Sequence, residues 1–288
     1  MAYNVEISKS YKAEISRKNP GCLLFLVDQS ASIEDPFGGA DGGRSKAEEL
    51  ATILNKLIHN LSIRCAKSDA IYDYFHVGVI GYSEDRARPA FGGTLSGREL
   101  VAISELANNP LRIEDRSKKS DDGAGGIVEQ KVKFPVWFDP SCASGTPMCA
   151  ALRMAADVVQ GWAIEHARGF PPIIINLTDG ESTDGDPEPE STALASLCTD
   201  DGPVLLFNAH LSSTSGAPIE LPSTPDGLPD QYARKLFEMS SPLTPFMLAR
   251  AREMGIPVNE DSRGFVFNAQ PVQIIQFLDI GTRPANLR

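Results

Sequence analysis

The sequence lacks the features of a membrane-spanning, secreted or disulfide-stabilised protein. No apolar run approaches the roughly 18 residues that a transmembrane helix needs, and the first twenty residues contain no apolar signal-peptide core. The five cysteines are odd in number and form no Cys-x-x-Cys pair, so neither a disulfide framework nor a cysteine zinc site is expected. We therefore expect a protein of the reducing cytoplasm, with no membrane partner.

Basic residues are missing from one long stretch. Between Arg168 and Arg234 there is no Lys or Arg, and the eleven acids of this stretch match the net charge of −11 of the whole chain. An acidic balance argues against nucleic acid or an anionic membrane as the main partner. The stretch is either a solvated acidic face or a surface that attracts cations or basic partners. Its acids are Asp179, Glu181, Asp184, Asp186, Glu188, Glu190, Asp200, Asp201, Glu220, Asp226 and Asp230.

Short apolar runs alternate along the chain with segments of helical periodicity. The runs predict buried strands at 22–27, 75–82, 171–178, 204–211 and 264–267. Helices are predicted at 45–64, 148–165, 190–199, 231–239, 244–254 and 271–279. This alternation predicts an α/β fold with a Rossmann-like, doubly wound, mostly parallel sheet flanked by helices. We expect an N-terminal segment at 1–20 and a single domain at 21–288.

The segment 84–145 interrupts this alternation and is interpreted as an elaborated insert. It contains a possible short helix at 97–107, a polar loop at 114–126 and a strand or hairpin arm at 127–138. Within it, Gly123–Gly126 lacks the Lys-Ser/Thr of a phosphate loop and is interpreted as a flexible turn. A basic cluster there is either a solvated loop or a contact for an acidic or phosphorylated partner; it comprises Arg112, Arg116, Lys118 and Lys119.

Three polar motifs follow predicted strands or precede a predicted helix. They are Asp-Gln-Ser-Ala-Ser at 28–32, Ser-Gly-Thr-Pro-Met at 144–148 and Thr-Asp-Gly-Glu at 178–181. Ligands of open α/β sheets bind outside the carboxyl ends of the strands, where these motifs meet. Their carboxylates and hydroxyls are oxygen ligands that suit a hard cation: Mg²⁺ first, with Mn²⁺ or Ca²⁺ as alternatives.

Each motif taken alone also has a structural interpretation. The Asp and Ser residues of 28–32 favour turns, and Thr146 would cap a helix whose first residue is Pro147. Glu181 and Asp184 are expected to be solvated acids rather than outer ligands of a site. His210 and Cys149 are expected to have structural roles, in a strand end and in a helix core respectively.

With these motifs in order, the sequence resembles the von Willebrand factor A (vWA) domain with an intact metal-ion-dependent adhesion site. The resemblance covers roughly 20–280, with 84–145 as the least typical part. It implies five metal ligands, which are Asp28, Ser30, Ser32, Thr146 and Asp179. Ala31 departs from the glycine common in the family, and its small side chain should leave the loop intact. The family fold implies one antiparallel strand, which we expect within 84–138.

The resemblance implies a protein-interaction module rather than an enzyme. A partner protein would complete the metal shell with an Asp or Glu, near a rim at Gln29, Gly145, Gly180 and Glu181. The chain looks similar to stand-alone, tellurite-resistance-associated bacterial vWA proteins, which implies a protein kinase or PP2C-type phosphatase partner and a role in stress-response signalling. The alternative is a metal-dependent hydrolase or phosphoryl-transfer enzyme, although no general base can be named.

Overall fold

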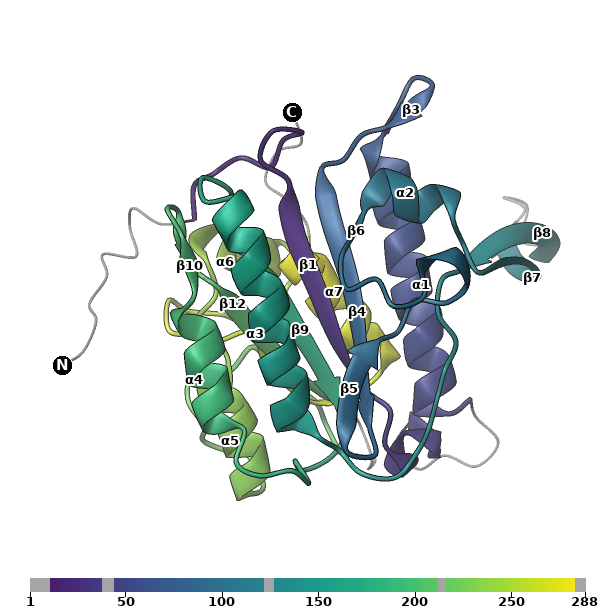
Figure 1. Cartoon of the computed structure of the whole chain (residues 1–288). Helices are drawn as coiled ribbons and strands as arrows, with labels where there is room; N and C mark the ends of the chain where they lie inside the picture. The colour runs from purple at the N-terminus through teal and green to yellow at the C-terminus, as the bar shows by residue number, and fades with distance from the viewer. Residues whose placement is uncertain (1–10, 38–43, 122–126, 212–215, 283–288) are drawn as a thin grey trace.

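A mostly parallel sheet forms the centre of the computed structural model. The structure describes residues 11–37, 44–121, 127–211 and 216–282, and for residues 118–121 and 127–130 it describes the backbone alone. The sheet has eight strands in the order β13-β14-β12-β9-β1-β4-β5, and β6 also pairs with β4 (Figure 1). Its parallel members are β1 (Gly21–Asp28), β4 (Phe75–Ser83), β9 (Ile173–Thr178), β12 (Leu205–Leu211) and β14 (Phe265–Ala269). The antiparallel members are β5 (Arg86–Pro89), β6 (Val101–Ala102) and β13 (Ile219–Glu220).

Helices cover both faces of the sheet, and the central strand β1 shows why. Leu23 and Phe25 pack into the core under one set of helices, whereas Leu24 and Leu26 pack into the core under the other. Because both of its faces are buried, β1 is apolar from Cys22 to Val27 and does not alternate with polar residues. One set comprises α1 (Lys46–Cys65), α2 (Ile103–Asn108), α6 (Pro245–Glu253) and α7 (Pro271–Thr282), and the other α3 (Met148–Glu165), α4 (Glu188–Ser196) and α5 (Gln231–Met239) (Figure 1).

The predicted doubly wound, mostly parallel α/β fold is therefore confirmed. All five predicted parallel strands lie within two residues of their expected ends. The antiparallel strand expected within 84–138 is present twice, as β5 and β6. The helix predicted at 190–199 ends earlier, because the chain turns there into a small hairpin of β10 (Cys198–Thr199) and β11 (Gly202–Pro203). The helix predicted at 97–107 is only α2, since residues 101–102 pair with β4 instead.

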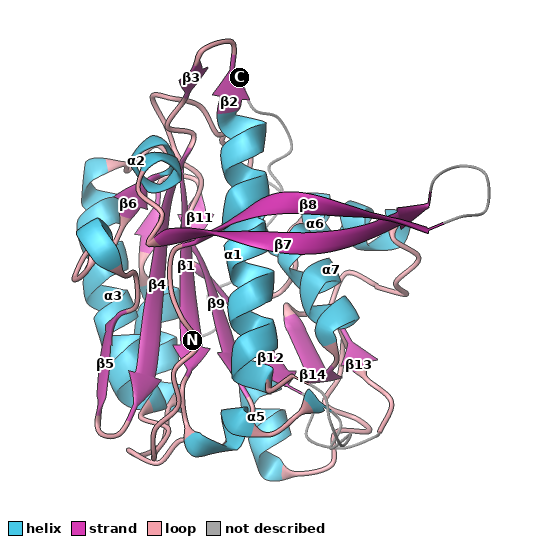
Figure 2. Ribbon diagram, turned by 90° about the vertical axis from the view of Figure 1, so that its right-hand side faces the viewer, coloured by secondary structure: helices cyan, strands magenta, loops and turns pink. Residues whose placement is uncertain are grey.

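The prediction of a polar loop at 114–126 is wrong for residues 114–121, which lie in a strand. β7 (Arg112–Asp121) pairs in antiparallel register with β8 (Ile127–Val136), and the two strands project from the body as a ribbon (Figure 2). Pairing between the two strands stabilises this polar ribbon, whereas the polar composition of β7 by itself predicts a loop. The hairpin arm predicted at 127–138 is confirmed as β8, whereas the turn predicted at Gly123–Gly126 lies outside the described residues.

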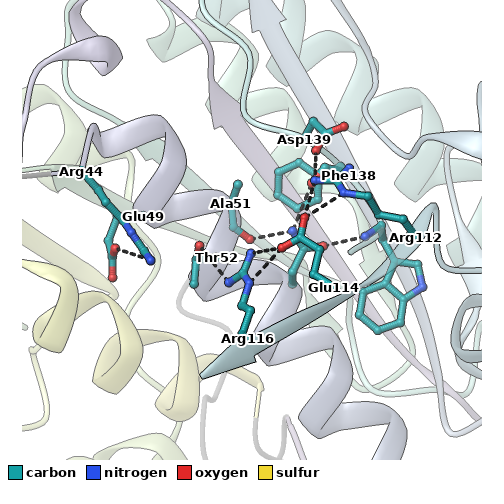
Figure 3. A network of polar contacts seen from close by, with 11 residues as sticks. Arg44, Glu49, Ala51, Thr52, Arg112, Glu114, Arg116, Phe138 and Asp139 are labelled. Carbon is teal, nitrogen blue, oxygen red and sulfur yellow. Dashed lines mark hydrogen bonds and ion pairs between the residues drawn. The ribbon is translucent and has the colours of Figure 1, made fainter. Parts of the chain in front are cut away.

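The basic cluster, interpreted from the sequence as either a solvated loop or a contact for an acidic or phosphorylated partner, lies on this ribbon. Arg112 and Arg116 each donate a hydrogen bond to Glu114, at 2.8 and 2.9 Å, and Arg112 also pairs with Asp139 (Figure 3). The guanidinium of Arg116 lies 3.6 Å from the ring centroid of Phe134. These pairings hold two of the four basic side chains at the base of the ribbon, and the side chains of Lys118 and Lys119 lie outside the described part.

A buried asparagine joins the end of the ribbon to α1. The Asn55 amide donates to the carbonyl of Phe138 at 3.0 Å and accepts from the backbone N–H of Trp137 at 2.8 Å. Both aromatic side chains are almost fully buried. The segment that leaves the ribbon for the 144–148 loop is therefore anchored at its start.

None of the helices in the described ranges has the length and hydrophobicity of a membrane-spanning segment.

Candidate cation site

Three loops from different parts of the chain meet at one edge of the sheet. β1 lies between β4 and β9 in parallel register, so Asp28 at its end is opposite Tyr82 and next to the end of β9. The loop that contains the 144–148 motif joins these two strand ends, because Ser30 forms an isolated bridge with Ala143. The Ala143 N–H donates a hydrogen bond to the carbonyl of Gln29 at 2.8 Å. Parallel strands thus bring residues more than a hundred positions apart to one place.

Asp28 is a deeply buried carboxylate at this edge. Its side chain accepts hydrogen bonds from the Thr178 hydroxyl at 2.6 Å and from the backbone N–H of Ser30 at 2.9 Å. The residue is 1% exposed. Burial raises the pKa of Asp28 to about 6, although the hydrogen bonds from Thr178 and Ser30 oppose this rise. A carboxylate that is costly to ionise in isolation gains from a bound cation.

Two serines link Asp28 to the second carboxylate. The Ser30 and Ser32 hydroxyls are hydrogen-bonded at 3.0 Å, and the Ser32 hydroxyl donates to Asp179 Oδ1 at 2.6 Å. Ser32 lies in a short 3₁₀ helix, η2 (Ala31–Glu34), and is exposed, whereas Ser30 is buried. Hydroxyls and carboxylates of the first and third motifs therefore form one connected group.

Thr146 completes the group of five predicted ligands. Its backbone is fixed to the third motif's loop, since its N–H donates to the Thr183 hydroxyl at 2.8 Å and its carbonyl accepts from the Thr183 N–H at 2.9 Å. Its Oγ1 lies 3.7 Å from the point that a Cβ on Gly180 would occupy. The hydroxyl thus faces the Thr178–Glu181 loop, and all five predicted residues come together at one edge.

The helix cap predicted for Thr146 is wrong. α3 begins at Met148 with Pro147 as its N-cap residue, and no side chain of that residue caps it. The free N–H groups of the first turn are instead bound by Asp184, which accepts from Cys149 at 3.0 Å and from Ala150 at 2.8 Å. Although burial acts in the opposite direction, these backbone hydrogen bonds lower the pKa of Asp184. Asp184 is exposed, as expected, and it is in addition a long-range cap of this helix.

Lys46 is a member of the site that the sequence analysis missed. Its Nζ lies 2.5 Å from Asp179 Oδ2, and the two side chains are 1% and 0% exposed. A capping box between Ser45 and Glu48 starts α1 and fixes Lys46 as its first residue. The sequence holds a signal for this placement, because Lys46 stands four residues before Leu50 and so shares the apolar face of the helix.

The predicted rim residues differ in exposure. Glu181 is exposed, and Gly145 and Gly180 are half-buried. Gln29 is only 6% exposed, and its Oε1 lies 2.3 Å from the point that a Cβ on Gly81 would occupy. The Gln29 side chain therefore packs over the neighbouring strand, and of the four predicted rim residues only the other three contribute to the surface around the site.

Cys149 is buried and His210 is half-buried near the site, in agreement with the structural roles expected for them. His210 is opposite Thr178 in the sheet, and its ring stacks on Phe267 with centroids 4.5 Å apart. Burial lowers the pKa of His210 to about 4, so its imidazole is neutral at pH 7. Burial also raises the pKa of the Cys149 thiol. Neither the imidazole nor the thiol is therefore in the charged form at neutral pH.

The donor atoms suit a hard cation and little else. Asp28, Ser30, Ser32, Thr146 and Asp179 present only carboxylate and hydroxyl oxygens, which Mg²⁺, Mn²⁺ and Ca²⁺ prefer. Within the described ranges, no group of three or more His, Cys, Asp or Glu side chains is placed to hold a metal ion. A cation at this edge would be bound by two carboxylates and several neutral hydroxyls, and because Lys46 already pairs with Asp179, only part of the charge of the cation would be neutralised.

Comparisons with known proteins give similarity to solved structures alone. No protein-family model matches the sequence, and no curated protein matches it. The ArnB paralog VWA2 from Sulfolobus acidocaldarius is 12% identical over 68% of this chain and 36% of its own, with a TM-score of 0.35. The vWF domain of the type V pili tip protein Mfa5 from Porphyromonas gingivalis is 13% identical over 57% of this chain and 39% of its own, with a TM-score of 0.31.

A third similar structure is the PilB minor pilin from Streptococcus sanguinis, 14% identical over 56% of this chain and 30% of its own, with a TM-score of 0.27. The chain thus spans well under two thirds of the length of each of these structures. Two of the three are described as vWA or vWF domains.

Proposed function

We propose that this chain is a vWA-type protein-interaction module that uses a divalent cation, Mg²⁺ first and Mn²⁺ or Ca²⁺ as alternatives. The observation that carries the proposal is the convergence of five oxygen-bearing side chains, from three separate loops, at the carboxyl edge of a parallel sheet. The cation would be held by these five residues and would supply an electrophilic position for an oxygen of another molecule.

The proposed ligand is an Asp or Glu side chain of a partner protein. A cation whose charge is only partly neutralised by its own site favours an anionic group in the remaining position. Exposed acids stand close by in the sequence, among them Glu34, Asp35 and Glu181. They repel a broadly acidic surface within about 8–10 Å at physiological salt. We therefore propose a partner with one acidic anchor in a neutral or basic surround.

The setting that we propose is cytoplasmic signalling, with a protein kinase or a PP2C-type phosphatase as partner and a role in stress response. This part of the proposal rests on the resemblance of the sequence to tellurite-resistance-associated vWA proteins. It is independent of the cation site, so the two parts can fail separately.

A peptide panel tests the proposed interaction directly. Each peptide carries a single Asp or Glu among neutral and basic residues, and its matched partner carries Asn or Gln at that position. We expect binding that requires the carboxylate and Mg²⁺ or Mn²⁺, and that is lost in Asp28→Ala but kept in Asp157→Ala, which removes an exposed carboxylate on α3. Equal binding in chelator, or by Asp28→Ala, would show that the cation site is not the interface.

The same variants decide between this proposal and an enzyme. A metal-dependent hydrolysis of phosphoesters or peptides that disappears in Asp28→Ala would replace the interaction module with the alternative function. No turnover by wild-type protein with Mg²⁺ or Mn²⁺, together with cation-dependent peptide binding, supports the module.

A further inference from the structure

A lysine supplies a buried positive charge to the candidate cation site. The Lys46 ammonium lies 2.5 Å from Asp179 Oδ2, and both side chains are almost completely shielded from solvent. A buried charge is tolerated where a partner of opposite charge compensates its loss of hydration. The ammonium therefore holds one oxygen of a carboxylate that the proposed cation would also use.

The rest of the site continues from the same carboxylate. The other oxygen, Asp179 Oδ1, accepts a hydrogen bond from the Ser32 hydroxyl at 2.6 Å, and Ser32 is bonded in turn to Ser30. A divalent cation that binds these hydroxyls would share Asp179 with Lys46. Two positive charges that share one carboxylate in a shielded site repel each other more strongly than they would in water.

From this geometry we propose that Lys46 competes with a bound divalent cation for Asp179. Lys46 thereby keeps the site folded without metal and weakens the affinity of the site for a divalent cation. The inference rests on the proposed function, because it takes Asp179 as a ligand of the cation. Lys46 is thus a positioning residue with two opposite effects. It stabilises the metal-free chain, and it raises the cation concentration that the site needs.

The test uses neutral replacements of Lys46 and the metal alone as the probe. Lys46→Gln keeps a hydrogen-bond donor near Asp179 without the charge, and Lys46→Met removes both. The matched control is Lys56→Gln, which neutralises an exposed lysine on the same helix. Mn²⁺ and Mg²⁺ affinities are measured by titration calorimetry, and melting temperatures are measured in chelator and in saturating metal.

We expect Lys46→Gln to bind Mn²⁺ at least about tenfold more tightly than wild type. In chelator, its melting temperature should fall by on the order of 10 °C, because Asp179 loses its buried partner. Saturating Mn²⁺ should restore most of this loss, since the metal then supplies the missing charge. Lys46→Met should show the same signs, and Lys56→Gln should match wild type in both measurements.

The outcomes separate this inference from the proposed function. If wild type binds metal through Asp28 and neither Lys46 variant binds it more tightly, the inference fails and the proposed function stands. If only the Lys46 variants bind metal, the inference stands and the natural chain is not cation-dependent. If no variant binds metal, both fail. Weaker metal binding after loss of Lys46 would also overturn the inference, because the lysine would then support the site.

Discussion

Gly145 offers a sharp test of how the site is built, because its backbone requires glycine for two separable reasons. Its φ is +80°, a left-handed conformation that costs an L-residue roughly 1–2 kcal/mol. In addition, a Cβ at this position would lie 2.5 Å from the backbone carbonyl oxygen of Glu84, and backbone cannot yield as a flexible side chain does. Such overpacking typically costs about 1–3 kcal/mol more. We therefore expect Gly145→Ala to destabilise the chain by about 2–5 kcal/mol.

A matched glycine isolates the second reason. Gly227 has a φ of +82°, and a Cβ added there meets nothing within 4 Å. Gly227→Ala should therefore lose only about 1–2 kcal/mol for its conformation. Urea unfolding of both variants in chelator gives the difference, which we expect to be about 1–3 kcal/mol.

The same variant should weaken the cation site. Gly145 directly precedes Thr146, so a shift that relieves the contact with Glu84 moves the Thr146 hydroxyl away from the other four predicted ligands. The metal-induced rise in melting temperature should then be smaller in Gly145→Ala than in Gly227→Ala. If both variants lose the same stability in chelator, the close approach of the two loops does not constrain the site and the argument is refuted.

Two further predictions concern the Asn55 anchor of the ribbon and the half-buried His210. Asn55→Ala leaves the Trp137 N–H and the buried carbonyl of Phe138 without their Asn55 partner, and it should lower the free energy of unfolding by about 2–5 kcal/mol in urea unfolding. The control, Asn108→Ala, removes an exposed amide that is hydrogen-bonded within its own helix and should cost less than about 1 kcal/mol. Equal losses in the two variants would contradict the anchoring role of Asn55. Since the pKa of His210 is lowered from 6.5 to about 4 in the folded chain, this residue binds more protons in the unfolded chain between these values, and its contribution to stability should rise with pH from about 4 to 6.5 by up to about 3 kcal/mol. That share of the pH dependence should be missing from His210→Asn; an unchanged profile would show that the imidazole is hydrated in the folded chain.

Much of the fold was predictable because each central strand is buried on both faces. Such strands are continuous apolar runs, and the alternating helices have apolar stripes, so their positions follow from local sequence. The polar ribbon of β7 and β8 was not predictable in this way. Its strands are stabilised by each other rather than by a core, and their composition alone resembles a loop.

The carboxylates and hydroxyls of the site were predictable from the sequence, but its buried lysine, Lys46, was not. Strand ends mark where Asp28 and Asp179 must meet, whereas the pairing of Lys46 with Asp179 depends on how α1 is set against the sheet. Asp184 shows the same limit. Its role as a cap of α3 depends on two loops that meet only in the folded chain.

Thermal unfolding of wild type and Asp28→Ala, each in chelator, Mg²⁺, Mn²⁺ or Ca²⁺, tests the central proposal most directly. A cation that binds only the folded chain, present at a hundred times its dissociation constant, stabilises the chain by about 2.7 kcal/mol, which corresponds to a rise in melting temperature of roughly 4–5 °C for a chain of this size. We predict such a rise with at least one of the three cations in wild type and in Asp157→Ala, and none in Asp28→Ala. No rise in wild type, or an equal rise in Asp28→Ala, would contradict a cation site at this edge of the sheet.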